Sequence, residues 1–287
     1  LFIVVTKSGT TPEILSMYYY FRQKVGKENF AFITDPKKGK LREIAQQDNI
    51  PVFDIPENVG GRFSVLTAVG LLPAKLIGLD IEALLKGAQT MRDQFLSESA
   101  DENLPFKIAT IQHALSKKNK SITVMMPYAQ KLIRFSDWYK QLLAESIGKR
   151  LDNQGNDVFV GLTPTSALGV TDQHSQSQLY NEGPNDKLII FVEDTSTTTD
   201  MIIPEIYEGV TFKKLLSVEL DATAGSLTKN DRPNIKIQVD SVSEESLGQL
   251  FMLFEGATAF LGEFFNINAF DQPGVELSKD LTREALK

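Results

Sequence analysis

Short apolar runs alternate along this chain with longer amphipathic stretches, and this alternation restricts the fold more than any other feature. In the first part of the chain, residues 1–5, 30–34 and 51–53 are typical of buried strands, and helical patterns separate them. Strands that alternate with helices form parallel sheets, because each helix returns the chain to the end at which the next strand begins. The sequence therefore predicts an α/β fold with doubly wound parallel sheets.

A second series of the same kind follows a long helical region. Residues 64–116 have helical patterns without an obvious strand. The strands expected after this region are residues 121–126, 157–161, 187–192 and 234–239. A strong helix is predicted over 244–265, and a shorter one over 272–287, with Pro273 in its first turn.

The length of the chain favours two domains. With 287 residues, of which 42% are hydrophobic, the chain is long for one core and apolar enough for two. A domain boundary is predicted near residues 98–106, because the stretch SESADENLP is polar and ends in a proline. We therefore expect domains of residues 1–100 and 101–287. The apolar run at residues 1–5 begins abruptly, and we expect the first domain to be incomplete at its N-terminus.

Composition excludes several classes of protein. The formal net charge of -7 argues against a general nucleic-acid surface, which needs a concentrated excess of Lys and Arg. No apolar run approaches the roughly 20 residues that span a bilayer, so no membrane association is expected. The absence of cysteine removes disulfides and thiolate metal sites, and we expect a cytoplasmic protein without a metal.

The segment TKSGTTPE follows the first predicted strand and precedes a helix. The hydroxyl groups of Thr6, Ser8, Thr10 and Thr11, together with the charge of Lys7, would lie at the positive end of a helix dipole. This arrangement is suited to a phosphate group. The alternative is a capping box, since Thr10 and Glu13 have the required spacing.

The segment ENVGGRFSVLTAVG contains a second candidate, Arg62, directly after Gly60 and Gly61. Paired glycines allow close backbone approach or a positive φ, so that an arginine could project from a tight turn toward an anion. The alternative is a surface arginine that follows a flexible turn.

Glu145, in AESIGKR, is a candidate general base, which would need partial burial to raise its basicity. The alternative is a solvent-exposed ion pair with Lys149, four residues further along the helix.

His174, in TDQHSQ, is suited to proton exchange near neutral pH, although an ordinary polar helix start remains an alternative. His113 lies in the amphipathic stretch IQHALSKK, so we expect it to have a structural role only. Lys279, in FDQPGVELSK, would by itself be a solvent-exposed lysine.

These five segments, in this order, resemble signatures of the phosphoglucose isomerase family, in its bacterial branch, over nearly the whole chain. The GGRFS block is the most specific of them. The resemblance implies two sugar-isomerase (SIS-type) domains. It implies interconversion of glucose 6-phosphate and fructose 6-phosphate through a cis-enediol, without a cofactor. The family's upstream phosphate segment, rich in glycine and serine, has no counterpart here.

The resemblance also implies residue roles. Thr6, Lys7, Ser8, Thr10 and Thr11 would lie at the substrate phosphate. Arg62 would stabilise the enediolate, and Glu145 would move the proton between C2 and C1. His174 and Lys279 would open the ring, and Gly61 and Gln272 would contact the substrate. Family members are homodimers, so His174 would reach the pocket of a neighbouring subunit.

Three alternatives stay open on sequence. Within the same fold, the substrate could be an aminosugar phosphate, a heptose phosphate or also mannose 6-phosphate. A non-catalytic sugar-phosphate regulator would keep the phosphate segment and lose the proton-transfer residues, and the presence of Glu145, His174 and Arg62 argues against it. An interaction protein with an acidic surface would need a dedicated patch, and the sequence contains none.

Overall fold

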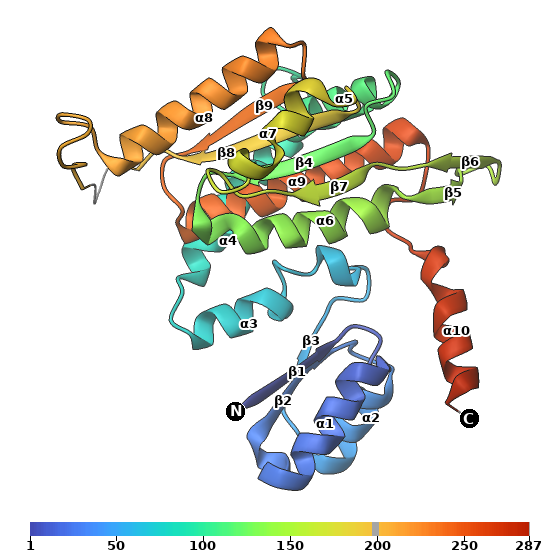
Figure 1. Ribbon diagram of the computed structural model, residues 1–287. Helices are drawn as coiled ribbons and strands as arrows, with labels where there is room; N and C mark the ends of the chain where they lie inside the picture. Colours follow the sequence, from blue (N-terminus) through green and yellow to red (C-terminus); the bar gives the residue numbers. More distant parts are fainter. Residues whose placement is uncertain (197–200, 287) are drawn as a thin grey trace. The chain divides into compact units, whose positions relative to one another are not determined.

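The computed structural model describes residues 1–196 and 201–286 (Figure 1). The chain divides into two compact units, Leu1–Lys86 and Gly87–Lys287. This division falls inside helix α4 (Ile81–Phe95), upstream of the polar segment at which the sequence places a domain boundary. The assignment of residues 1–100 and 101–287 to separate domains stays a prediction.

The first unit contains a parallel sheet with the strand order β1-β2-β3. Its strands confirm the three predicted apolar runs: β1 (Phe2–Thr6), β2 (Phe30–Thr34) and β3 (Val52–Asp54). Helices α1 (Pro12–Val25) and α2 (Lys40–Asp48) connect them. Alternate strand residues point to one face, where Tyr18 of α1 lies edge-on to Phe30 and Phe32 at 5.1 Å between ring centroids.

Short helices complete the first unit. The 3-10 helix η1 (Lys27–Asn29) precedes β2, and the 3-10 helix η2 (Gly61–Phe63) follows β3. Helix α3 (Ala68–Leu76) begins at Thr67, whose hydroxyl oxygen accepts a hydrogen bond from the Val69 N–H at 3.3 Å. This cap satisfies one of the free N–H groups of the first helical turn.

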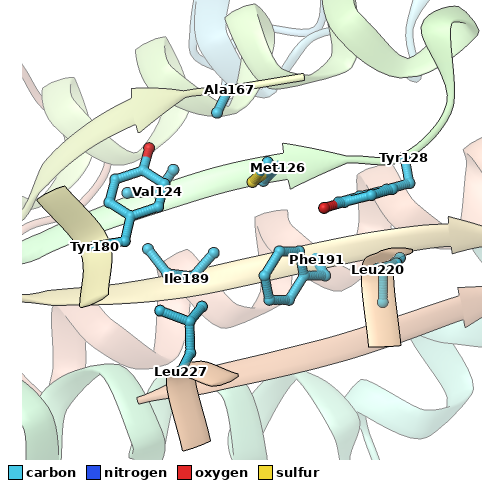
Figure 2. Packing of buried hydrophobic residues seen from close by; sticks show 9 residues of the cluster. All are labelled: Val124, Met126, Tyr128, Ala167, Tyr180, Ile189, Phe191, Leu220 and Leu227. Carbon is cyan, nitrogen blue, oxygen red and sulfur yellow. The ribbon is translucent and has the colours of Figure 1, made fainter. Parts of the chain in front are cut away.

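The second unit contains a four-stranded parallel sheet with the order β7-β4-β8-β9. Its strands are β4 (Ile122–Pro127), β7 (Thr163–Ser166), β8 (Lys187–Asp194) and β9 (Asn234–Val239). Helices α7 (Gln173–Glu182) and α8 (Phe212–Lys229) contribute to the buried apolar cluster on one face. Figure 2 shows side chains of β4 and β8 in this cluster together with Tyr180, Leu220 and Leu227 from these helices.

The opposite face of this sheet packs against α5 (Leu104–Ser116), α6 (Ile133–Ile147) and α9 (Glu244–Phe265). A buried polar group links the layers: Gln112 donates to the Tyr139 hydroxyl at 3.0 Å and to the Thr123 hydroxyl at 3.3 Å. Ser243 and Ser246 form a capping box at the start of α9. Helices on both faces, together with the parallel strands, confirm the predicted fold class.

One predicted strand is wrong. Residues 157–161 were expected in the parallel series, but β6 (Asp157–Val160) pairs antiparallel with β5 (Lys149–Leu151) in a separate hairpin that projects from the unit (Figure 1). The remaining strand of the sheet is β7, which is not among the strands predicted from the sequence. Its residues, TPTS, contain no apolar run, and Pro164 is tolerated because β7 lies at the edge of the sheet, beside β4.

The C-terminal segment forms the 3-10 helix η4 (Pro273–Val275) and helix α10 (Glu276–Ala285). Lys287, the last residue of the predicted terminal helix, lies outside the described residues. Another 3-10 helix, η3 (Gln130–Leu132), precedes α6. Over residues 1–196 and 201–286, no helix combines the length and apolarity needed to span a membrane.

Candidate active site

Four hydroxyl groups gather between the carboxyl end of β1 and the start of α1, in a segment that we call the hydroxyl loop (Thr6–Thr11). The Thr6 and Thr11 oxygens lie 2.7 Å apart, and the Ser8 oxygen accepts from the Thr10 N–H at 3.2 Å. Thr11, not Thr10, is the N-cap of α1, and its side chain makes no capping hydrogen bond. The capping-box alternative is therefore wrong, and the hydroxyl groups lie at the positive end of a helix dipole.

The ammonium group of Lys7 contacts groups of the first unit. It donates to the backbone carbonyl of Pro56 at 2.6 Å and lies 3.7 Å from a carboxylate oxygen of Asp35. Hydrogen bonding from the Lys37 N–H lowers the pKa of Asp35, and the charge of Lys7 acts in the same direction. The Asp35 carboxylate and the Pro56 carbonyl hold the ammonium group of Lys7 in place at the hydroxyl loop. A contact between Lys7 and phosphate stays a prediction.

Arg62 lies in η2 and is only 6% exposed, so the alternative of a surface arginine is wrong. Gly60 has φ -68°, and neither Gly60 nor Gly61 has a positive φ. The turn is instead held by local hydrogen bonds, including one from the Ser64 hydroxyl to the Gly61 carbonyl at 2.6 Å. Apart from Gly61 itself and its two chain neighbours, no heavy atom of the described residues lies within 4 Å of the position that a Cβ on Gly61 would take, which leaves space beside this backbone.

Glu145 lies in the last turn of α6 and is partly buried. Its role as a general base stays a prediction. The side-chain amide of Gln141, one turn earlier, donates to its carboxylate at 3.3 Å. This hydrogen bond orients the carboxylate along the helix surface.

Lys149 has a different environment from the one considered in the sequence analysis. Its side chain is only 5% exposed, so it does not form a solvent-exposed ion pair. Its ammonium group donates to the backbone carbonyls of Glu145 at 2.8 Å, Ser146 at 3.0 Å and Asp271 at 2.9 Å. Sequence reasoning missed this residue, and the one available signal was a cation two residues after the end of a helix.

Gln272 and Lys279 lie in the C-terminal segment and are exposed. Gln272 precedes η4, directly after Asp271. The ammonium group of Lys279 pairs with the Glu276 carboxylate at 2.6 Å, one helical turn earlier in α10. Their predicted contacts with substrate stay predictions.

His174 lies in the first turn of α7 and is exposed. The start of this helix is held firmly, because Asp172 accepts from the Leu168 N–H at 2.7 Å and the Tyr128 hydroxyl donates to Gln173 at 2.7 Å. His113, the other histidine of the chain, packs beside the ring of Phe265, with 5.0 Å between the ring centroids. Burial lowers the pKa of His113.

Glu145 and His174 belong to opposite ends of strand β7. The start of β7 lies beside the end of α6, because a Cβ added to Gly161, two residues before β7, would lie 3.5 Å from the Cα of Gly148. Gly148 directly follows α6, and Glu145 lies in the last turn of that helix. His174 comes after the carboxyl end of β7, and a strand of this length spans roughly 13 Å. The structure therefore does not bring these two side chains together through β7 within one chain.

The part of the chain that the structure describes contains no group of three or more His, Asp or Glu side chains arranged to hold a metal ion. The site residues fall into two sets, one on each unit. The hydroxyl loop and Arg62 belong to the first unit, whereas Glu145, His174, Gln272 and Lys279 belong to the second.

The fold and these sites define an α/β protein of parallel sheets, with candidate polar groups in segments that follow the carboxyl ends of β1, β3 and β7. A family model described as phosphoglucose isomerase matches residues 1–200 and 214–287. The chain belongs to the phosphoglucose isomerase family.

Individual relatives agree with this assignment. The chain is 46% identical over 298 residues to a protein of Carboxydothermus hydrogenoformans named glucose-6-phosphate isomerase, with 98% of this chain covered. A hypothetical protein of Thermus thermophilus has a crystal structure with TM-score 0.90 and 38% identity, covering 99% of this chain and 71% of that one. A glucose-6-phosphate isomerase from Chlamydia trachomatis gives TM-score 0.84 and 25% identity over 99% of this chain.

The chain is shorter than these relatives. It spans 64% of the length of the Carboxydothermus protein and 58% of the Chlamydia chain.

Proposed function

We propose that this protein interconverts glucose 6-phosphate and fructose 6-phosphate in the cytoplasm, as an aldose-ketose isomerase of glycolysis and gluconeogenesis. The observation that carries the proposal is the hydroxyl loop, in which four hydroxyl groups and a helix N-terminus form an arrangement suited to a phosphate monoester. The family assignment and the name of the Carboxydothermus relative support the same reaction.

In the proposed reaction, the substrate phosphate binds the hydroxyl loop. Ser8 and Thr11 would be direct contacts, with Thr6, Lys7 and Thr10 completing the site. Glu145 acts as the general base: it removes a proton from C2 of the open-chain aldose and returns it to C1. Its position in the last turn of α6, with the carboxylate oriented by the side-chain amide of Gln141, supports this role.

The guanidinium group of Arg62 stabilises the charge that develops on the enediolate oxygen. Its burial supports this role, since a charge acts more strongly where water is excluded. His174 and Lys279 exchange the proton that opens and closes the sugar ring, and Gly61 and Gln272 contact the substrate. The reaction needs no cofactor, because it moves one proton from C2 to C1 and another from the C2 hydroxyl to the C1 oxygen, with no net oxidation or reduction.

The active protein is proposed to be a homodimer in which His174 serves the partner subunit. The positions of Glu145 and His174 at opposite ends of β7 support this arrangement, because a second copy could supply the histidine that the same chain does not bring to Glu145 through this strand. The exposure of His174 also supports it, since the side chain is available to another subunit.

Proton exchange with solvent tests the proposed chemistry. The complete protein is incubated with fructose 6-phosphate in heavy water, and deuterium at C2 of the product is measured by NMR. The wild type is expected to incorporate solvent deuterium, and Glu145→Gln is expected to lose about a hundredfold to ten-thousandfold in rate, as is typical for a missing general base.

Glu182→Gln is the matched control. Glu182 also lies at the end of a helix and accepts a hydrogen bond from a glutamine one turn earlier, Gln178, at 2.7 Å. This variant should retain the wild-type rate. Equal incorporation by wild type and Glu145→Gln would reject Glu145 as the base.

The same assay with mannose 6-phosphate tests the wider specificity. A wild type that binds sugar phosphate without turnover would support a non-catalytic regulator.

A further inference from the structure

A buried ammonium group joins two segments of the second unit that carry proposed catalytic residues. Lys149 lies two residues after the end of α6, whose last turn contains Glu145, and its ammonium group donates to the Glu145 carbonyl at 2.8 Å. The same group donates to the carbonyl of Asp271 at 2.9 Å and lies 3.5 Å from its carboxylate. Asp271 precedes Gln272 and the short connection to the helix of Lys279.

The chemistry of this contact makes it restrictive. A buried ammonium group is costly unless oxygen atoms replace its hydration shell, and the contacts described above supply three carbonyl oxygens and one carboxylate. Two of the carbonyls end α6, where the helix dipole places partial negative charge. Moving the segment of Asp271 away from α6 would therefore leave part of this buried charge without a partner.

We infer that Lys149 is a positioning residue for proton transfer, and this inference rests on the proposed function. It holds the backbone of the general base, Glu145, in a fixed relation to the segment that leads into Gln272. Displacement of a reacting group by about 1 Å can cost about a hundredfold in rate, so this contact acts on turnover as well as on stability. The hydroxyl loop belongs to the other unit and is not held by Lys149.

Lys149→Met tests the inference in the complete protein, because methionine keeps most of the side-chain volume and removes every donor. Lys187→Met is the matched control. Lys187 is also buried, with its side chain 10% exposed, and it donates to the Pro184 carbonyl at 3.0 Å and pairs with Asp186. It lies at the start of β8, and the partners described for its ammonium group, Pro184 and Asp186, are not proposed catalytic residues. Turnover, KM for fructose 6-phosphate and thermal unfolding are measured for both variants.

Lys149→Met is expected to lower kcat by about tenfold to a hundredfold and to change KM by less than about threefold. Lys187→Met is expected to lower the melting temperature while kcat per folded molecule stays at the wild-type value. If kcat of folded Lys149→Met equals that of Lys187→Met, Lys149 is only structural and the inference is overturned. An inactive wild type would instead overturn the proposed function, and the inference with it.

Asp271→Asn provides a second variant if Lys149→Met does not fold. The Asp271 side chain is 49% exposed, and asparagine keeps the backbone carbonyl that Lys149 contacts, so folding should be preserved. Loss of the carboxylate is expected to lower kcat by about two- to fivefold with an unchanged melting temperature. A wild-type kcat in Asp271→Asn, when Lys149→Met is unfolded, would overturn the inference.

Discussion

Gly9 and Gly39 lie in backbone contact. A Cβ on Gly9 would lie 3.0 Å from the Cα of Gly39, and both residues have positive φ, +66° and +99°. The Gly9 carbonyl also accepts from the N–H of Leu41 at 3.1 Å. This contact holds the hydroxyl loop against the start of α2, and the two backbone segments can approach this closely only because each residue lacks a side chain.

Gly39→Ala is expected to destabilise the protein and to weaken phosphate binding. Its Cβ would lie 2.4 Å from the carbonyl oxygen of Ser8, so the hydroxyl loop must move. The unfavourable backbone conformation adds about 1–3 kcal/mol to the loss of stability. Chemical denaturation and titration with fructose 6-phosphate measure the two effects.

Gly78→Ala is the matched control for this variant. Gly78 has φ +88°, but apart from Gly78 and its two chain neighbours no heavy atom of the described part of the chain lies within 4 Å of the position that an added Cβ would take. This variant should lose stability through backbone strain alone and bind sugar phosphate normally. Equal affinities for Gly39→Ala and Gly78→Ala would contradict a role for the glycine contact in forming the hydroxyl loop.

Ser8→Ala is expected to weaken binding of fructose 6-phosphate by about tenfold to 150-fold, because a hydrogen bond to a charged group contributes about 1.5–3 kcal/mol. The Ser8 hydroxyl is exposed and lies 3.4 Å from those of both Thr6 and Thr11, so it is central to the cluster. Isothermal titration calorimetry measures the change. Ser16→Ala, at an exposed position of helix α1, which follows the hydroxyl loop, is the control and should bind as the wild type does.

Mixing two inactive variants tests whether the active site uses residues of two subunits. A mixed dimer of Glu145→Gln and His174→Ala would contain one site with both substitutions and one site with neither. If subunits assort at random, the mixture should recover about a quarter of the wild-type activity, because half of the dimers are mixed and each has one intact site. Recovery is measured after joint refolding, with each variant refolded alone as the control. No recovery from dimers that are shown to be mixed would contradict the shared site.

The burial of the Glu255 carboxyl group predicts that the stability of the protein depends on pH. Its Oε1 is buried and has no hydrogen-bond partner among the described residues, and burial raises the pKa of Glu255 from 4.5 to about 8. Between these two values the folded state binds the proton more tightly than the unfolded state does. Stability should therefore fall as pH rises through this window, by up to about 1.4 kcal/mol per pH unit from this group.

Glu255→Gln removes the ionisable group and keeps its shape. The melting temperature of this variant is expected to exceed that of the wild type by more at pH 8 than at pH 5. Glu263→Gln, at an exposed position of the same helix, should show no such difference. An equal effect of Glu255→Gln at both pH values would mean that Glu255 is not the source of the pH dependence.

Elements with strong local patterns could be predicted from the chain alone. Strand β2 and helix α9 have the predicted bounds, Phe30–Thr34 and Glu244–Phe265. Their apolar periodicity and the serine cap of α9 act within a few residues, so they can be identified without a partner. The order of the candidate site segments was also visible, because each combines polar groups with turn residues in one short stretch.

Pairing between distant segments required the three-dimensional structure. Strand β7 has a polar sequence and becomes a strand because it pairs with β4, whereas the more apolar β6 joins a hairpin. Lys149 looked like the partner of Glu145 in an exposed ion pair, yet it is buried against the carbonyl of Asp271, 122 residues away. Periodicity and caps report on neighbours along the chain, but the burial of a charge depends on which remote oxygen atoms the fold brings to it.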